Sequence, residues 1–129
     1  MPTLLRVNQL QVFFPVHAGL LRRKVDEIKA VQEVSFAIEE GRTMGLVGES
    51  GSGKSTVARA ILKLLKATGG EVWWRDREIL SMRESEFRPL RKDMQIVFQD
   101  PYGSLNPRMT VEDIIAEPLR IHFRQQNKA

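Results

Sequence analysis

The feature that most constrains the fold is the glycine-rich run GESGSGKST at residues 48–56. The short apolar stretch Met44–Val47 leads straight into it, and apolar residues at helical spacing follow it. Closely spaced glycines let successive backbone N–H groups turn inward and form a concavity that binds anions. A helix that starts at this point adds its positive end. The run therefore predicts a strand, a phosphate-binding loop and a helix in that order, which is an α/β arrangement.

The run also matches the P-loop pattern G-x-x-x-x-G-K-[ST]. In that pattern Lys54 supplies a mobile positive charge for the β and γ phosphates, and the Ser55 hydroxyl is placed for Mg²⁺. A glycine-rich turn that only caps a helix is the alternative, but it needs no lysine. We therefore expect ATP with Mg²⁺ as the ligand. The predicted binding residues are Gly48, Glu49, Ser50, Gly51, Ser52, Gly53, Lys54, Ser55 and Thr56.

The rest of the chain alternates between strand and helix patterns. Strands are predicted where apolar residues run or alternate with a period of two, at Val7–Phe14, Val34–Ile38, Met44–Val47, Val72–Trp74 and Met94–Phe98. Helical spacing predicts helices after Gly53, over residues 83–92, and after Thr110, which resembles an N-cap. Pro118 is expected to kink or shorten the last helix. Residues 16–29 and 100–108 are predicted to be loops.

Composition excludes several classes of protein. Hydrophobic residues make up 42% of the 129 and charged residues 28%, as in ordinary globular proteins. The net charge of +4 comes from scattered basic residues, which does not favour a nucleic-acid partner. The chain has no cysteine, so it has no disulfides and no thiolate metal site. Met1–Leu10 lacks the apolar core of a signal peptide. No run approaches the roughly 18 apolar residues of a membrane span.

Three segments together resemble the ATPase subunits of ATP-binding-cassette importers, specifically the oligopeptide/dipeptide branch. They are residues 48–56, the stretch IVFQDPYGSLNPR at 96–108, and IAEPL at 115–119. The resemblance implies a P-loop NTPase core of this family, preceded by an antiparallel β subdomain. It divides the chain into a mainly β part at 1–41, the core from P-loop to glutamine at 42–99, and the start of a helical, transporter-facing region at 100–129.

The resemblance also implies roles for two residues outside the P-loop. Phe14 matches the aromatic residue that stacks on adenine, with Phe13 as the competing choice and a core phenylalanine as the alternative. Gln99 matches the glutamine that approaches Mg²⁺ and positions the attacking water. The implied partners are transmembrane permease subunits and a second nucleotide-binding domain in a head-to-tail dimer. The implied location is the cytoplasmic face of the plasma membrane, held there by those partners.

The chain departs from the family pattern in what it lacks. The Leu-Ser-Gly-Gly-Gln signature, an apolar strand ending in Asp-Glu and a switch histidine are absent from the sequence; His17 and His122 have no matching context. We therefore expect the N-terminal part of an importer ATPase that binds ATP but does not hydrolyse it alone. The rival hypotheses are a stand-alone ATP-binding or docking module and a small P-loop kinase acting on a metabolite.

Overall fold

The computed structural model describes residues 2–18, 23–100 and 102–123. It divides into two compact units, residues 1–83 and 84–129. Each unit is described by itself below.

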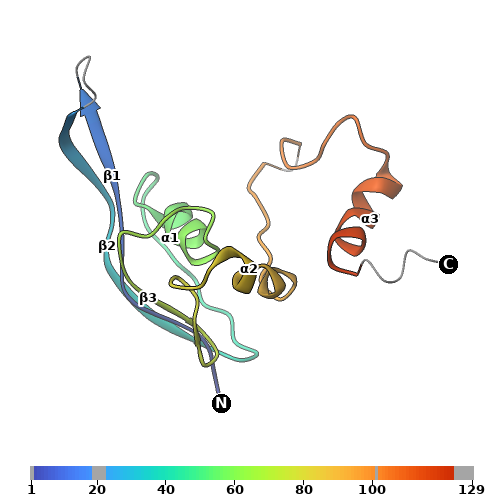
Figure 1. Cartoon of the computed structure of the whole chain (residues 1–129), viewed down its shortest axis with the longest axis horizontal. Coiled ribbons are helices and arrows are strands. Elements are labelled where there is room, and N and C mark those ends of the chain that lie inside the picture. The colour runs from blue at the N-terminus through green and yellow to red at the C-terminus, as the bar shows by residue number, and fades with distance from the viewer. Residues whose placement is uncertain (1, 19–22, 101, 124–129) are drawn as a thin grey trace. The chain divides into compact units, whose positions relative to one another are not determined.

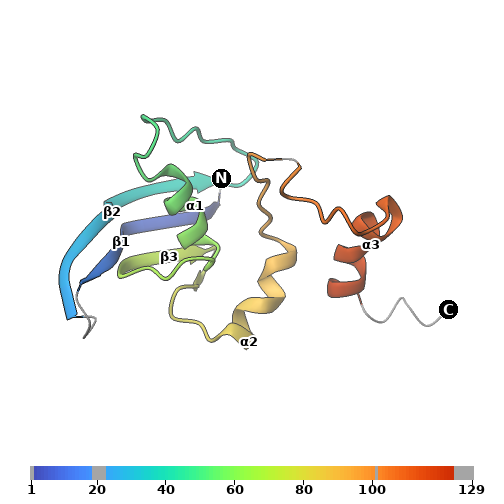
Figure 2. The ribbon, with the colours of Figure 1, turned by 90° about the horizontal axis from the view of Figure 1, so that it is seen from above.

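The first unit is built on a four-stranded antiparallel sheet (Figures 1 and 2). The order across the sheet is β2-β1-β3-β4, in which β1 is Thr3–Ala18, β2 is Arg23–Glu39, β3 is Gly69–Trp74 and β4 is Arg77–Glu78. The predicted strands at Val7–Phe14, Val34–Ile38 and Val72–Trp74 are confirmed. The antiparallel β subdomain expected at the start of the chain is therefore present.

The longest strands, β1 and β2, extend beyond the rest of the sheet as a two-stranded arm. β3 pairs with β1 only from Leu5 to Gln11, whereas β2 pairs with β1 as far as Ala18. Figure 1 shows this arm rising past the end of β3. The prediction of a loop over residues 16–29 is therefore wrong, except at residues 19–22, which lie outside the described part. The segment was predicted as a loop because it is polar. Strands that extend beyond the rest of the sheet are exposed to solvent, so they can be equally polar.

Irregular pairing bends the sheet where β1 passes between its two neighbours. Gln9 and Glu33 both adopt positive φ angles, 47° and 50°, and the register shifts between Val7 and Leu10. The Gln9 amide donates to the Ser35 hydroxyl at 2.7 Å instead of to a strand carbonyl. Gly70, at φ +85°, fits against this bulge, because a Cβ there would lie 2.4 Å from the Gln9 carbonyl oxygen. A side chain at Gly70 would force this junction apart.

The helix α1 (Lys54–Ile61) covers one face of the sheet (Figure 2). Its buried residues Val57, Ala60 and Ile61 meet the buried face of the sheet, which confirms the helix predicted after the glycine-rich run. The helix ends at Ile61. The apolar residues that follow it at helical spacing lie in a turn and not in the helix. The core residues of this unit are Leu5, Val7, Leu10, Val12, Val31, Val57, Ala60, Ile61, Val72 and Ile79.

A carboxylate closes the β3–β4 hairpin, whose turn contains Arg75 at φ 53° where a glycine is common in such turns. Glu78 accepts hydrogen bonds from the amides of Val72, Leu80 and Ser81. Partial burial opposes ionisation of Glu78, but the bonds from Ser81, Leu80 and Val72 outweigh it and hold its pKa below the ordinary value. The ionised carboxylate thus fixes the chain as it leaves the sheet.

Two predicted strands are absent from the structure. Residues 42–49 and 94–98 carry no strand pairing, and their apolar side chains are exposed: Val47 by 91% and Val97 by 96%. A strand needs a neighbour for its backbone hydrogen bonds. Both segments have the apolar sequence of buried parallel strands, but no described strand lies beside them. The prediction of strands at Met44–Val47 and Met94–Phe98 is therefore wrong for this structure.

The second unit is helical. It contains α2 (Glu84–Phe87), a 3₁₀ helix η1 (Arg88–Lys92) and α3 (Val111–His122). The predicted helix over 83–92 is confirmed as this α2–η1 pair, and the predicted N-cap is confirmed because the Thr110 hydroxyl accepts from the Asp113 amide at 3.1 Å. Pro118 lies inside α3, which continues to His122, so the helix is not shortened, and the alternative of a kink stays a prediction. No helix in the described ranges is long and apolar enough to span a membrane.

Candidate nucleotide-binding site

The candidate site begins at the N-terminus of α1. Gly53 is the N-cap of this helix and has the left-handed conformation, φ 93° and ψ 3°. Its carbonyl accepts the first helical hydrogen bond, from the Val57 amide at 2.9 Å, and no side chain caps the helix start. The first amides of a helix have no partner within the helix. The start of α1 therefore offers uncapped N–H groups and the positive end of the helix dipole, which together attract an anion.

A tight backbone contact fixes the position of this helix start on the sheet. A Cβ at Gly53 would lie 2.4 Å from the Ala30 carbonyl oxygen and 3.6 Å from Val31 Cγ2. Only glycine fits, because both its φ angle and this approach exclude a side chain. Ala30 and Val31 thus position the loop. The sequence did not predict this role, because a backbone carbonyl can contact a loop far along the chain whatever its side chain is.

Lys54 lies inside the loop that precedes it. Its ammonium Nζ donates to the carbonyls of Gly48 at 2.7 Å and Glu49 at 2.5 Å, and lies 3.3 Å from Ser52 Oγ. These contacts join the beginning of the loop to the beginning of the helix. The positive charge is therefore held within the loop of residues 48–53, in the part of the chain where the P-loop pattern requires it.

Hydroxyl groups follow the lysine on the first turn of α1. Ser55 is exposed and Thr56 is half-buried. Mg²⁺ prefers hard oxygen ligands and retains several waters, so it needs few groups from the protein. A serine hydroxyl beside a phosphate site fits this preference. In the described part of the chain, no group of three or more His, Cys, Asp or Glu residues could hold a metal by itself.

The neighbouring residues Phe13 and Phe14 face opposite sides of the arm. Phe13 lies under the Lys29 ammonium, which is 5.8 Å from the ring centroid, and its amide donates to the Thr68 hydroxyl. Phe14 follows the buried Val12 by two positions and therefore shares its face, the face that α1 covers. Phe14 is 38% exposed. Of the two, only Phe14 is on the side of the loop.

Gln99 belongs to the second unit, so the geometry of the first unit does not include it. It is exposed and precedes a tightly folded loop. Asp100 shapes this loop: its carboxylate accepts from the amides of Tyr102 and Gly103 at 3.0 Å each, and its carbonyl accepts from Ser104. The structure thus brings Phe14 and residues 48–56 together in one unit, and places the predicted water-positioning residue in the other.

Comparison with known families identifies the chain. The family model described as "ABC transporter" matches residues 31–129, and the chain belongs to that family.

Two curated relatives agree with this assignment. The glutathione import ATP-binding protein GsiA of Escherichia coli (strain K12) is 49% identical over 118 residues. The match covers 92% of this chain and 19% of GsiA. The oligopeptide transport ATP-binding protein AppF of Bacillus subtilis (strain 168) is 45% identical over 131 residues, covering 98% of this chain and 40% of AppF. The chain thus spans less than half the length of these relatives.

Solved structures show the same fold. The dimeric, post-hydrolysis structure of the ATP-binding cassette MJ0796 with ADP and Pi matches with a TM-score of 0.74 at 28% identity. The match covers 93% of this chain and 48% of that one. A second dimeric structure of MJ0796 matches with a TM-score of 0.75 at 27% identity. The expected fold class, an ABC-type P-loop ATPase, is confirmed.

Proposed function

We propose that this chain binds Mg-ATP in the loop of residues 48–56, as part of an importer ATPase. The observation that carries the proposal is the loop itself: an ammonium group bonded to the backbone of a glycine-rich loop, at a helix start that has no side-chain cap. This combination suits a polyphosphate, because backbone amides, helix dipole and lysine all favour negative charge at one place. The name of each relative, an ATP-binding protein, supports adenosine as the nucleoside.

Within this proposal Lys54 binds the β and γ phosphates, Ser55 and Gln99 hold Mg²⁺, and Gln99 also orients water. The bound metal would neutralise phosphate charge during transfer. Gln99 suits its task because an amide both donates and accepts hydrogen bonds and stays uncharged. Phosphoryl transfer depends mainly on positioning and charge stabilisation, so these groups would contribute by orienting the reactants and stabilising negative charge.

We also propose that the complete importer transports peptides or related small solutes, since the similar proteins are named for glutathione and oligopeptide import. Its transmembrane permease subunits would receive the second unit, and a second nucleotide-binding domain would pair with the first, which would place the chain at the cytoplasmic face of the membrane. An exposed apolar stripe on α3 supports the first contact: Val111, Ile115 and Leu119 are 74%, 69% and 54% exposed. The division of the chain into residues 1–41, 42–99 and 100–129 is also part of this proposal.

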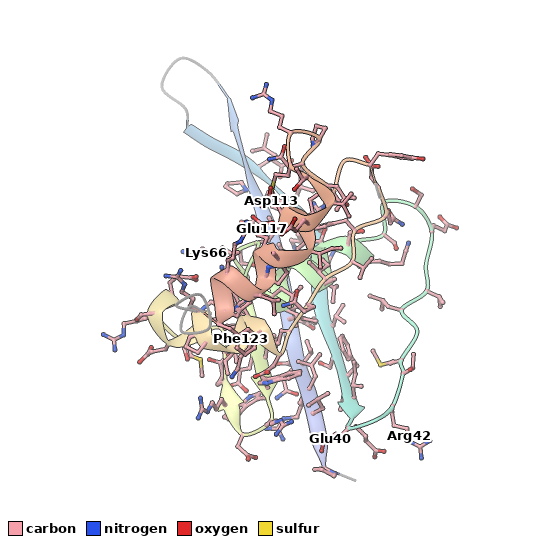
Figure 3. The ribbon with its side chains drawn as sticks, turned by 90° about the vertical axis from the view of Figure 1, so that its right-hand side faces the viewer. Glu40, Arg42, Lys66, Asp113, Glu117 and Phe123 are labelled. Carbon is pink, nitrogen blue, oxygen red and sulfur yellow. The ribbon has the colours of Figure 1, made fainter. Side chains whose placement is uncertain are left out.

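The test of ATP binding is Lys54→Ala. Losing a charge-assisted contact costs about 1.5–3 kcal/mol, so affinity for Mg-ATP should fall roughly ten- to a hundredfold. Isothermal titration calorimetry measures both proteins. Lys66→Ala is the matched control, because Lys66 is an exposed lysine of the same unit (Figure 3). Equal affinities in the folded wild-type and Lys54→Ala proteins would contradict the proposal.

A further inference from the structure

The strand β2 presents an apolar side chain next to Phe14. The register pairs Phe14 with Ile28, and directly opposite residues of an antiparallel pair share a face. Ile28 is 60% exposed and Phe14 38% exposed. The pair therefore forms a small apolar surface on the arm, beyond the edge of the covered core at Val12 and Val31.

This surface is on the same side of the sheet as the phosphate-binding loop. Val12 and Val31 are paired and buried, and the Gly53 position lies against Val31 on that side. The irregularity between Val12 and Phe13 adds a residue to β2 only, so β1 keeps its alternation and Phe14 returns to the face of Val12. Ile28 shares this face through its pairing with Phe14.

The separation along β2 also matches the shape of a nucleotide. Gly53, which ends the loop, contacts β2 at Ala30 and Val31, and Ile28 lies two to three residues further along the strand. At about 3.3 Å per residue this is roughly 7–10 Å. A ribose with its first phosphate fills such a gap between a phosphate concavity and a base. The apolar surface is thus continuous with the proposed phosphate site and at the distance where a base would lie.

We infer that Ile28 is a base-binding residue, which forms with Phe14 the apolar wall for the adenine of the bound nucleotide. This inference rests on the proposed function, since the phosphates must occupy residues 48–56 for the base to reach the wall. Phe14 offers a ring face for stacking, and Ile28 extends the apolar contact across to the second strand. The two residues come from strands joined by backbone hydrogen bonds, so the wall is preformed.

The experiment compares Mg-ATP with Mg-tripolyphosphate, which has no base, by titration calorimetry. Ile28→Thr keeps the β-branched shape suited to a strand but replaces a methylene-bearing branch with a hydroxyl. Its affinity for ATP should fall roughly three- to tenfold, and its affinity for tripolyphosphate should not change. Ile28→Val should retain most of the ATP affinity. Ile121→Thr, the same change at an exposed site in the other unit, should affect neither ligand.

The outcomes separate this inference from the proposal beneath it. An Ile28→Thr protein that unfolds at the wild-type temperature and binds ATP as tightly as wild type would overturn the base-binding role. Equal weakening for ATP and tripolyphosphate would overturn it too, because the effect would then lie at the phosphates. Lys54→Ala should weaken both ligands. If it weakens neither, the phosphate site itself fails, and the wall fails with it.

Discussion

At the scale of single residues, the arm gives Phe13 and Phe14 different tasks. The ring of Phe13 is engaged by Lys29, and its backbone is tied to Thr68. The ring of Phe14 has no such partner among the described contacts and is on the face that α1 covers. A base that stacks beside the loop can therefore reach Phe14 and not Phe13.

The corresponding prediction compares two alanine variants. Base–aromatic stacking contributes about 1–3 kcal/mol, so Phe14→Ala should weaken Mg-ATP binding roughly five- to a hundredfold. Phe13→Ala should leave the ATP affinity within about twofold while lowering thermal stability, since the half-buried ring and its contact with the Lys29 ammonium are lost. Titration calorimetry and thermal denaturation distinguish the two. A reversed ranking would transfer the stacking role to Phe13.

Single residues were predictable where chemistry demands a residue type. The lysine, the hydroxyls and the glycines of residues 48–56 could be proposed as site residues from spacing, because phosphate binding needs those groups in that order. Ala30 and Ile28 could not, because their contributions are a carbonyl position and a cross-strand register. The positions of Ala30 and Ile28 both depend on how β1 pairs with β2. The polar sequence of these strands does not predict that register.

At the scale of elements, α3 is fixed at its first turn. The Thr110 hydroxyl accepts from the Asp113 amide and donates to the Asp113 carboxylate, which also accepts from Arg120 at 2.8 Å. The hydrogen bonds from Arg120 and then from Thr110 lower the pKa of Asp113. Since its folded pKa is below the unfolded value, the ionised carboxylate stabilises the helix above that value, near 3.9, and this stabilisation is lost as pH falls through the folded pKa.

We therefore predict that α3 loses helicity as pH is lowered from neutral to well below about 3.9, the ordinary pKa of an aspartate. The Cα chemical shifts of Val111–His122 measure this directly. Asp113→Asn should have weaker helical shifts at neutral pH and show a smaller change on acidification. Glu117→Gln is the matched change on the same helix and should behave as wild type. An acid transition that is the same size in Asp113→Asn and wild type would refute the role of Asp113.

Helices and strands could be predicted from the sequence where they are stabilised locally or have an amphipathic pattern. The helix α1, the α2–η1 pair and the Thr110 cap all have local signals, and the structure confirms them. Met44–Val47 and Met94–Phe98 were predicted from apolar runs alone. Such runs show that a segment would be buried in a sheet, but they do not supply the neighbouring strand that its amides and carbonyls require.

At the scale of the whole chain, the groups proposed for phosphate binding and for water positioning lie in separate units. The first unit has its own sheet, core and loop, so the contacts proposed for the phosphates and the base all lie within it. Val47, Val97 and Phe98 are exposed by 91%, 96% and 47%. Apolar segments of this kind favour association with other chains. Binding measurements should therefore be made at low concentration, on material shown to be monodisperse.

Hydrolysis makes larger demands than binding. The 129 residues contain no apolar strand that ends in Asp-Glu, no histidine in a switch context and no Leu-Ser-Gly-Gly-Gln signature. A missing charge clamp on the γ phosphate can lower the rate of phosphoryl transfer by about 10³–10⁵. A missing base costs about 10²–10⁴, and the two losses need not multiply when the groups act as a unit. Either loss alone brings turnover close to background.

We therefore predict that these 129 residues alone bind Mg-ATP without turning it over. The measurement is phosphate release from purified, monodisperse chain at saturating Mg-ATP, with Lys54→Ala as the control for contaminating ATPases. Wild type and Lys54→Ala should release phosphate at the same low rate although only wild type binds ATP tightly. Sustained release at about 1 s⁻¹ or faster, the range of ordinary enzymes, that disappears in Lys54→Ala would contradict the prediction. It would mean that a group within these residues activates the attacking water, and Gln99 would be the first residue to substitute.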